Sequence, residues 1–126
     1  MSTLNVSNIT DGTTTVGTSY VVNGSAKAYC NVNQTSTQAI RDSLNVSSIT
    51  DDGTGQTDIA YTSNMSSAEY GFSCGKGRTT GQNGGVIAHT NDTEPTASLI
   101  RILTFQENNA TIDEARANVS IHGDLA

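Results

Sequence analysis

Residues 44–54 read Leu-Asn-Val-Ser-Ser-Ile-Thr-Asp-Asp-Gly-Thr, and a very similar stretch, Leu-Asn-Val-Ser-Asn-Ile-Thr-Asp-Gly-Thr-Thr, occupies residues 4–14. In each copy apolar and polar residues first alternate, which is typical of a strand with one buried face. Each copy then runs into Asp-Gly, a strong turn signal. After the second copy, residues 57–62 (Thr-Asp-Ile-Ala-Tyr-Thr) read as a returning strand. The sequence therefore predicts a β-hairpin whose turn is Asp51-Asp52-Gly53.

The first copy has no such partner strand close behind it. Residues 13–20 are rich in Thr and Ser, and this polarity argues against their pairing as a strand. We therefore expect residues 1–24 to form an extended N-terminal arm, serving attachment or trimerisation. The copy at 4–14 would then find its strand partners on other chains.

Strand signals fill the rest of the chain, while helix signals are almost absent. Turn formers and β-branched residues dominate, which favours many short strands. Alternating or apolar runs predict further strands near 26–32, 40–49, 70–74, 86–89, 98–105 and 115–122. We therefore predict an all-β fold, an antiparallel β-sandwich of jelly-roll-like topology over residues 25–126.

The apolar content is low for a chain of this size. Leu, Ile, Val and Phe together make up 24 of 126 residues, a share close to that of chains that cannot fold alone. The predicted strand at 98–105 is apolar on both faces, so we expect its own subunit to bury one face and a partner the other. An obligate oligomer follows from this composition.

The charge balance excludes several classes of partner. With 6 basic and 12 acidic residues, the formal net charge is −6, which argues against nucleic-acid binding and against a basic membrane-binding patch. No apolar run approaches the roughly 18 residues of a transmembrane helix. The N-terminus lacks a secretory signal pattern, so we expect synthesis in a cytoplasm without general export.

The two cysteines, Cys30 and Cys74, both lie in alternating stretches. We interpret them as small buried core residues. A disulfide between them and a reactive thiol are the alternatives, which a cytoplasmic origin and the lack of a nearby His disfavour.

Residues 75–85 form a Gly-rich stretch with two cations, Lys76 and Arg78. The glycine spacing does not match a nucleotide-binding fingerprint, and no helix follows to bind a phosphate. We interpret the stretch as a surface loop and a candidate receptor-contact site. The residues we single out are Lys76, Arg78, Gln82 and Asn83.

Three other groups of residues are candidates for a metal-binding or catalytic site, and each also has a purely structural interpretation. Asp51, Asp52 and Asp58 suggest calcium, but a hairpin turn explains them. Glu107, Asp113 and Glu114 suggest a glycosidase carboxylate pair, but we expect a solvated loop before the last strand. His89 and His122 have no ligand-spaced partner, so surface positions are expected. We predict no catalytic, metal or cofactor site.

Two nearby stretches carry a family pattern: residues 27–35 read Lys-Ala-Tyr-Cys-Asn-Val-Asn-Gln-Thr, and residues 40–55 read Ile-Arg-Asp-Ser-Leu-Asn-Val-Ser-Ser-Ile-Thr-Asp-Asp-Gly-Thr-Gly. Together they resemble a segment of tail-fibre and related virion proteins of tailed bacteriophages, including those of cyanobacteria. The family form places Lys-Ala-Trp-Val-Asn-Phe before Asn-Val-Ser-Ser-Ile-Thr-Asp-x-Gly-Thr-Gly. This chain departs from that form at Tyr29, Cys30 and Val32, where smaller side chains give a smaller core. The alternation of inward and outward residues is kept. The C-terminal strand 119–126 is also similar.

The resemblance implies a non-enzymatic virion structural protein that forms a homotrimer. We expect a short tail fibre or receptor-binding tip, made in the bacterial cytoplasm and located in the virion, with other virion proteins and a host surface glycan or receptor as partners. The alternative is a capsid decoration or cement protein, in which the arm clasps capsid subunits. A third interpretation, from another class, is a small glycan-processing enzyme.

Overall fold

The structure is a computed structural model, and it describes residues 3–77, 84–88 and 94–126. No helix within these ranges has the length and apolarity needed to cross a membrane. The elements in chain order are β1 (Asn8–Thr10), β2 (Thr15–Gly17), α1 (Thr18–Gly24), β3 (Ala28–Asn33), β4 (Ala39–Leu44), β5 (Val46–Gly53), β6 (Gln56–Tyr61), β7 (Gly71–Lys76), β8 (Gly84–Ala88), β9 (Leu99–Gln106) and β10 (Ala117–His122).

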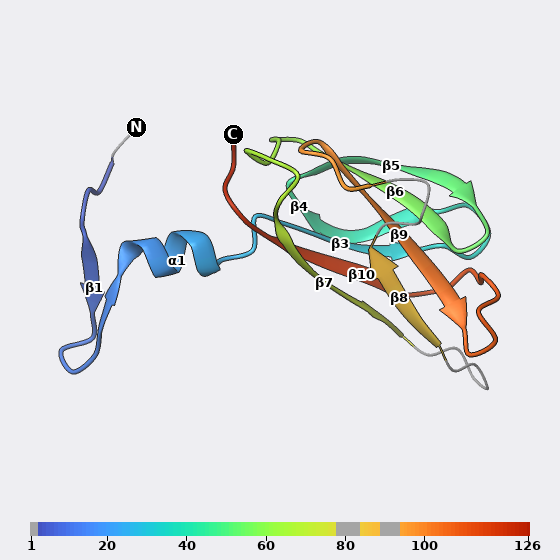
Figure 1. Cartoon of the computed structure of the whole chain (residues 1–126), viewed down its shortest axis with the longest axis horizontal. Coiled ribbons are helices and arrows are strands. Elements are labelled where there is room, and N and C mark those ends of the chain that lie inside the picture. Colours follow the sequence, from blue (N-terminus) through green and yellow to red (C-terminus); the bar gives the residue numbers. More distant parts are fainter. Residues whose placement is uncertain (1–2, 78–83, 89–93) are drawn as a thin grey trace.

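Two antiparallel four-stranded sheets carry most of the chain, with strand orders β4-β3-β10-β7 and β5-β6-β9-β8 (Figure 1). Their inner faces contribute to a single core, so the predicted all-β antiparallel class is confirmed. The strand order corrects the jelly-roll part of the prediction. Strand β3 pairs with β4, β5 with β6, and β8 with β9, and this pattern of simple hairpins differs from the two Greek keys of a jelly roll.

The core follows the alternation in the sequence. Along β3, β6, β9 and β10 every second residue is buried. The strand predicted near 115–122 is confirmed as β10, and its apolar residues Ala117, Val119 and Ile121 are buried. On β9 the inward residues are buried and the outward ones, among them Leu99 and Leu103, are half-buried. The buried hydrophobic residues are Ala28, Cys30, Val32, Ile59, Tyr61, Met65, Tyr70, Ile100, Ile102, Ala117, Val119 and Ile121.

The predicted hairpin is confirmed as β5–β6, but its turn lies two residues further on. Gly53 pairs with Gln56, so the loop residues are Thr54 and Gly55, and Asp51–Gly53 forms an irregularity in the strand. Gly55 has φ of +71°, and a Cβ there would lie 2.5 Å from the Thr104 carbonyl oxygen. Only glycine fits this position without displacing backbone.

The single strand predicted over 40–49 is wrong, because β4 ends before Asn45 and β5 begins after it, in the other sheet. Asn45 has φ of +56°, a left-handed conformation that Asn tolerates better than most residues. Its side chain holds the break in place, since Nδ2 donates to the Ser63 carbonyl at 2.9 Å and Oδ1 accepts from the Ser63 N–H at 2.7 Å. The break sends β4 into one sheet and β5 into the other.

The first copy of the repeated stretch also forms a hairpin, which corrects our expectation of an arm without internal partners. Strand β1 pairs with β2 antiparallel, from Asn8 opposite Gly17 to Thr10 opposite Thr15. The Asp11 carboxylate closes the turn by accepting the N–H groups of Thr13 and Thr14. Helix α1 follows at once, where we expected a linker. Figure 1 shows this segment, in blue, beside the sandwich.

Candidate functional site

The structure places Lys76 inside the sandwich and not on an exposed loop. Lys76 is opposite the inward-facing Ala117, so its side chain points between the sheets. Its ammonium lies 2.8 Å from the Glu114 carboxylate, and the two side chains are 7% and 0% exposed. Receptor contact by Lys76 therefore does not fit its position. Arg78, Gln82 and Asn83, the other predicted contact residues, lie outside the described residues.

The solvated loop expected before the last strand is confirmed for residues 107–111, which are exposed, but not for Glu114, which is fully buried in a polar network. Gln34 bonds to this loop twice, since its N–H donates to the Glu114 carbonyl at 2.9 Å and its side-chain oxygen accepts the Glu114 N–H at 3.2 Å. The Gln34 side chain accepts from the Thr104 hydroxyl at 2.8 Å and donates to that of Thr57 at 3.1 Å. Because these groups satisfy one another, the interior tolerates them without water. The network is structural, since it fixes the loop 107–116 to both sheets.

The carboxylates considered for glycoside hydrolysis do not act on a common point. Asp113 accepts the Gly55 N–H at 2.6 Å and so anchors the β5–β6 turn. Glu114 pairs with Lys76 instead. Each of these two carboxylates therefore has its own structural partner. This arrangement does not support acid–base catalysis at these positions.

Two of the three acidic residues considered for calcium, Asp52 and Asp58, contact an arginine, while the Asp51 carboxylate accepts the Gly53 N–H. The Arg101 guanidinium lies 2.6 Å from a carboxylate oxygen of Asp52 and makes a two-pronged contact with Asp58. The guanidinium occupies the place where a cation would bind. Among the described residues, no group of three or more His, Cys, Asp or Glu side chains is arranged to hold a metal ion.

Cys30 and Cys74 are free thiols on either side of Val119 in the sheet. Two strand spacings separate them, about 10 Å, which exceeds the reach of a disulfide. Cys30 is buried and Cys74 half-buried, and burial raises the thiol pKa of each to about 11. Both are therefore unreactive packing residues, as the sequence indicates.

His122 is half-buried, and its ring nitrogens lie 3.3 Å from the Ser120 hydroxyl and 3.2 Å from the Gly24 carbonyl. These contacts join the end of the arm to β10, so the imidazole has an ordinary structural environment. His89 lies outside the described residues.

The arm exposes large apolar side chains and buries none. Every residue from 3 to 24 is exposed or half-buried, and α1 has no buried residue. The sequence did not reveal α1, because it has neither a side-chain N-cap nor acidic residues in its first turn. Six of the ten exposed large hydrophobic residues in the described chain belong to this segment: Leu4, Val6, Ile9, Tyr20, Val21 and Val22.

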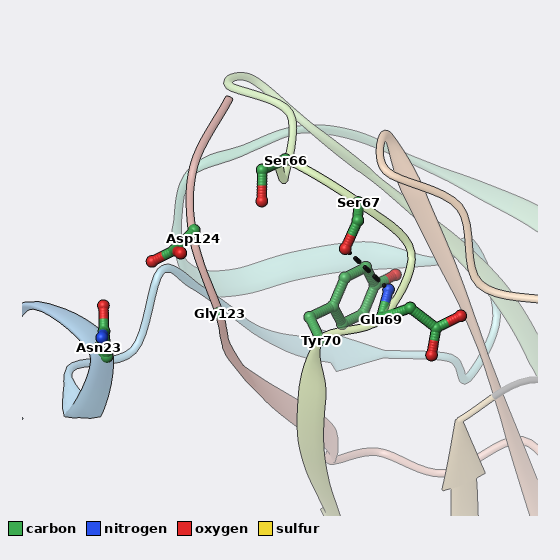
Figure 2. A pocket seen from close by; sticks show the side chains of 7 residues that line it. All are labelled: Asn23, Ser66, Ser67, Glu69, Tyr70, Gly123 and Asp124. Atoms are coloured by element: carbon green, nitrogen blue, oxygen red, sulfur yellow. Dashed lines mark hydrogen bonds between the residues drawn. The ribbon is translucent and has the colours of Figure 1, made fainter.

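A polar pocket of about 220 Å³ lies where the arm meets the sandwich. Figure 2 shows its lining residues, Asn23, Ser66, Ser67, Glu69, Tyr70, Gly123 and Asp124. The Ser67 hydroxyl accepts the Glu69 N–H at 3.1 Å, and the carboxylates of Glu69 and Asp124 point away from one another (Figure 2). The pocket therefore lacks a convergent set of charged groups, and no motif in the sequence marks it.

Comparisons with known proteins add no relative. No family model matches the chain, and it has no match among curated proteins or solved structures. Its function therefore has to be argued from its own residues and geometry.

Proposed function

We propose that the chain is a non-enzymatic virion structural protein of a tailed bacteriophage, the subunit of a short trimeric tail fibre or receptor-binding tip. The main support is the contrast between a sandwich with its own closed core and an arm without one. Its exposed residues include Leu4, at 85%, and Tyr20, at 76%. Exposed apolar side chains gathered on one segment are typical of a surface that another molecule covers.

The arm is also too small to be stable alone. A two-stranded hairpin is marginal in water, and a helix as short as α1, with 7 residues, falls far below the length at which isolated helices persist. An assembly in which neighbouring subunits cover the arm explains both its composition and its structure. The resemblance of residues 40–55 to phage virion proteins points to a virion as that assembly.

A capsid decoration protein is the second candidate, and the arm favours it. An apolar extension beside an independent domain can clasp a neighbouring capsid subunit as well as a copy of the same chain. In that case the purified chain is monomeric and binds capsids. In the fibre case it is a trimer in solution.

Labelling the intact particle tests the proposal. Antibodies against the sandwich should decorate the tail or its fibres in electron micrographs of the phage that encodes the chain. Decoration of the capsid alone would replace the fibre proposal with the decoration protein. Absence of the chain from purified particles would overturn both.

A further inference from the structure

The outer face of the sheet β4-β3-β10-β7 carries a set of polar side chains that point away from the core. Inward residues such as Cys30 and Val119 build the core, so the residues between them point outward. The strand register aligns Asp42, Asn31, Asn118 and Gly75 in one row across the sheet. A second row contains Leu44, Tyr29, Ser120 and Ser73.

From these two rows we propose that this face, built on Tyr29, Asn31, Asp42, Asn118, Ser120 and Ser73, binds a neutral oligosaccharide. The proposal rests on the receptor-binding role proposed above and gives that role a location and a ligand class. It moves the contact site from the loop at 75–85 to the sheet.

The chemistry of the first row matches sugar hydroxyls. The exposed Asn118 presents a donor and an acceptor in one plane, the exposed Asp42 presents two acceptors, and Asn31 lies between them in the row. Neighbouring hydroxyls of a pyranose can donate to one such group and accept from another. Since adjacent strands lie about 4.8 Å apart, the row spans about 10 Å, which suits two linked sugar rings.

One atom in this row already lacks a partner. The Asn31 side-chain oxygen is shielded from water and has no hydrogen-bond partner among the described residues. A shielded acceptor without a donor destabilises the fold. Because this one lies between the two exposed residues Asp42 and Asn118, a rotation of the Asn31 amide toward the surface would let a ligand hydroxyl donate to it.

Tyr29 supplies the aromatic surface. Its hydroxyl donates to Asp42 at 3.2 Å, which holds the phenol on the outer face beside Leu44. An aromatic ring fixed in this way can stack on the C–H face of a sugar, while its polar edge stays hydrated. Along the edge strand β7 the outward positions are Gly71, Ser73 and Gly75, so only small side chains flank the rows there.

The charge of the face selects a neutral ligand. Asp42 is the single charged residue in the two rows, and the chain as a whole carries −6. Phosphate, nucleic acid and acidic sugars are therefore repelled. A protein partner is also disfavoured, because Leu44 is the only exposed large apolar residue in these rows, and protein interfaces need larger apolar anchors.

The test is a titration of the isotope-labelled full-length chain, read by backbone amide shifts. The probes are maltohexaose, cellohexaose and a hexamer of N-acetylglucosamine, with an oligogalacturonate as the anionic counterpart. We expect saturable shifts at residues 29, 31, 118 and 120 with at least one neutral sugar and none with the anionic one. No shift with any sugar, shifts located elsewhere, or preference for the anionic sugar would overturn the proposal.

Variants separate recognition from folding. Asn118→Ala and Tyr29→Ala should each weaken binding about tenfold. Tyr29→Phe should weaken binding less than Tyr29→Ala does, because it keeps the ring and loses only the hydroxyl that bonds to Asp42. Asn64→Ala is the matched control, an exposed asparagine outside the face. Equal binding by all variants would contradict the site even if a sugar binds. Particle labelling is independent, so a virion protein that binds no sugar refutes only this inference.

Discussion

The two copies of the repeated stretch reach the same local structure with opposite burial. Both close a hairpin after Ile-Thr-Asp, but β1 and β2 have 3 residues each, whereas β5 has 8 and β6 has 6. Ile9 is 47% exposed, while its counterpart Ile49 packs against the core. The motif specifies a turn, and the sequence that surrounds it decides whether the hairpin gains a core. The second copy builds the subunit, and the first is available to other chains.

The largest difference in stability between a variant of the sandwich and a variant of the arm is expected at the buried ion pair of Lys76 and Glu114. Glu114→Ala leaves the Lys76 ammonium buried without its carboxylate and should lower the free energy of unfolding by about 3–5 kcal/mol. Asp11→Ala, which removes the carboxylate that closes the arm hairpin, should leave the unfolding of the sandwich unchanged. Urea denaturation followed by far-UV circular dichroism measures both variants. A Glu114 variant as stable as the unmodified chain would show that the network is dispensable.

Apolar truncation compares the two regions directly. Ile102→Ala removes a fully buried side chain and should cost about 2–5 kcal/mol, whereas Ile9→Ala in the arm should change stability by less than about 0.5 kcal/mol. The same denaturation experiment, on dilute protein, reports both values. Similar losses for the two variants would mean that the arm is covered within the subunit, contrary to the contrast drawn here.

The turn glycines give a smaller contrast of the same kind. Gly55→Ala combines a left-handed backbone with a Cβ placed 2.5 Å from the Thr104 carbonyl oxygen, so it should cost more than about 1 kcal/mol. Gly12 also has positive φ, but a Cβ there would meet nothing within 4 Å. Gly12→Ala should therefore loosen only the arm turn. Thermal unfolding of the sandwich measures the difference, and equal shifts for both variants would contradict it.

The smallest effect concerns pH. Backbone hydrogen bonds from Thr14 and Thr13 lower the pKa of the Asp11 carboxyl below its ordinary value of 3.8. The carboxylate thus stabilises the turn above that pH, and the stabilisation is lost as pH falls through the lowered folded-state pKa. Amide shifts of Thr13 and Thr14 in an acid titration should move together with that transition. Shifts with a midpoint above 3.8 would contradict the assignment.

The features that could be predicted from the sequence are those encoded by patterns of neighbouring residues. Alternation predicted the buried faces of β3, β6 and β10, and the strand signals on either side of Asp-Gly predicted the β5–β6 hairpin. Such signals involve neighbouring residues, so they can be read without knowledge of the tertiary structure.

The errors all depend on contacts distant in sequence or on single backbone angles. Glu114 looks like a loop residue until Lys76, 38 positions away, is placed beside it. The sheet change at Asn45 depends on one positive φ and on the backbone of Ser63. Helix α1 has weak local signals, and the arm hairpin is closed by side-chain capping at Asp11 more than by apolar pairing.

The central claim is that the sandwich folds by itself and the arm joins subunits. Analytical ultracentrifugation of the full chain and of residues 25–126 tests it most directly. We predict that the full chain sediments as a trimer of the 13.1 kDa subunit and that the truncated chain is a folded monomer. A full chain that remains monomeric at all concentrations, or a truncated chain that still forms the trimer, would contradict the account.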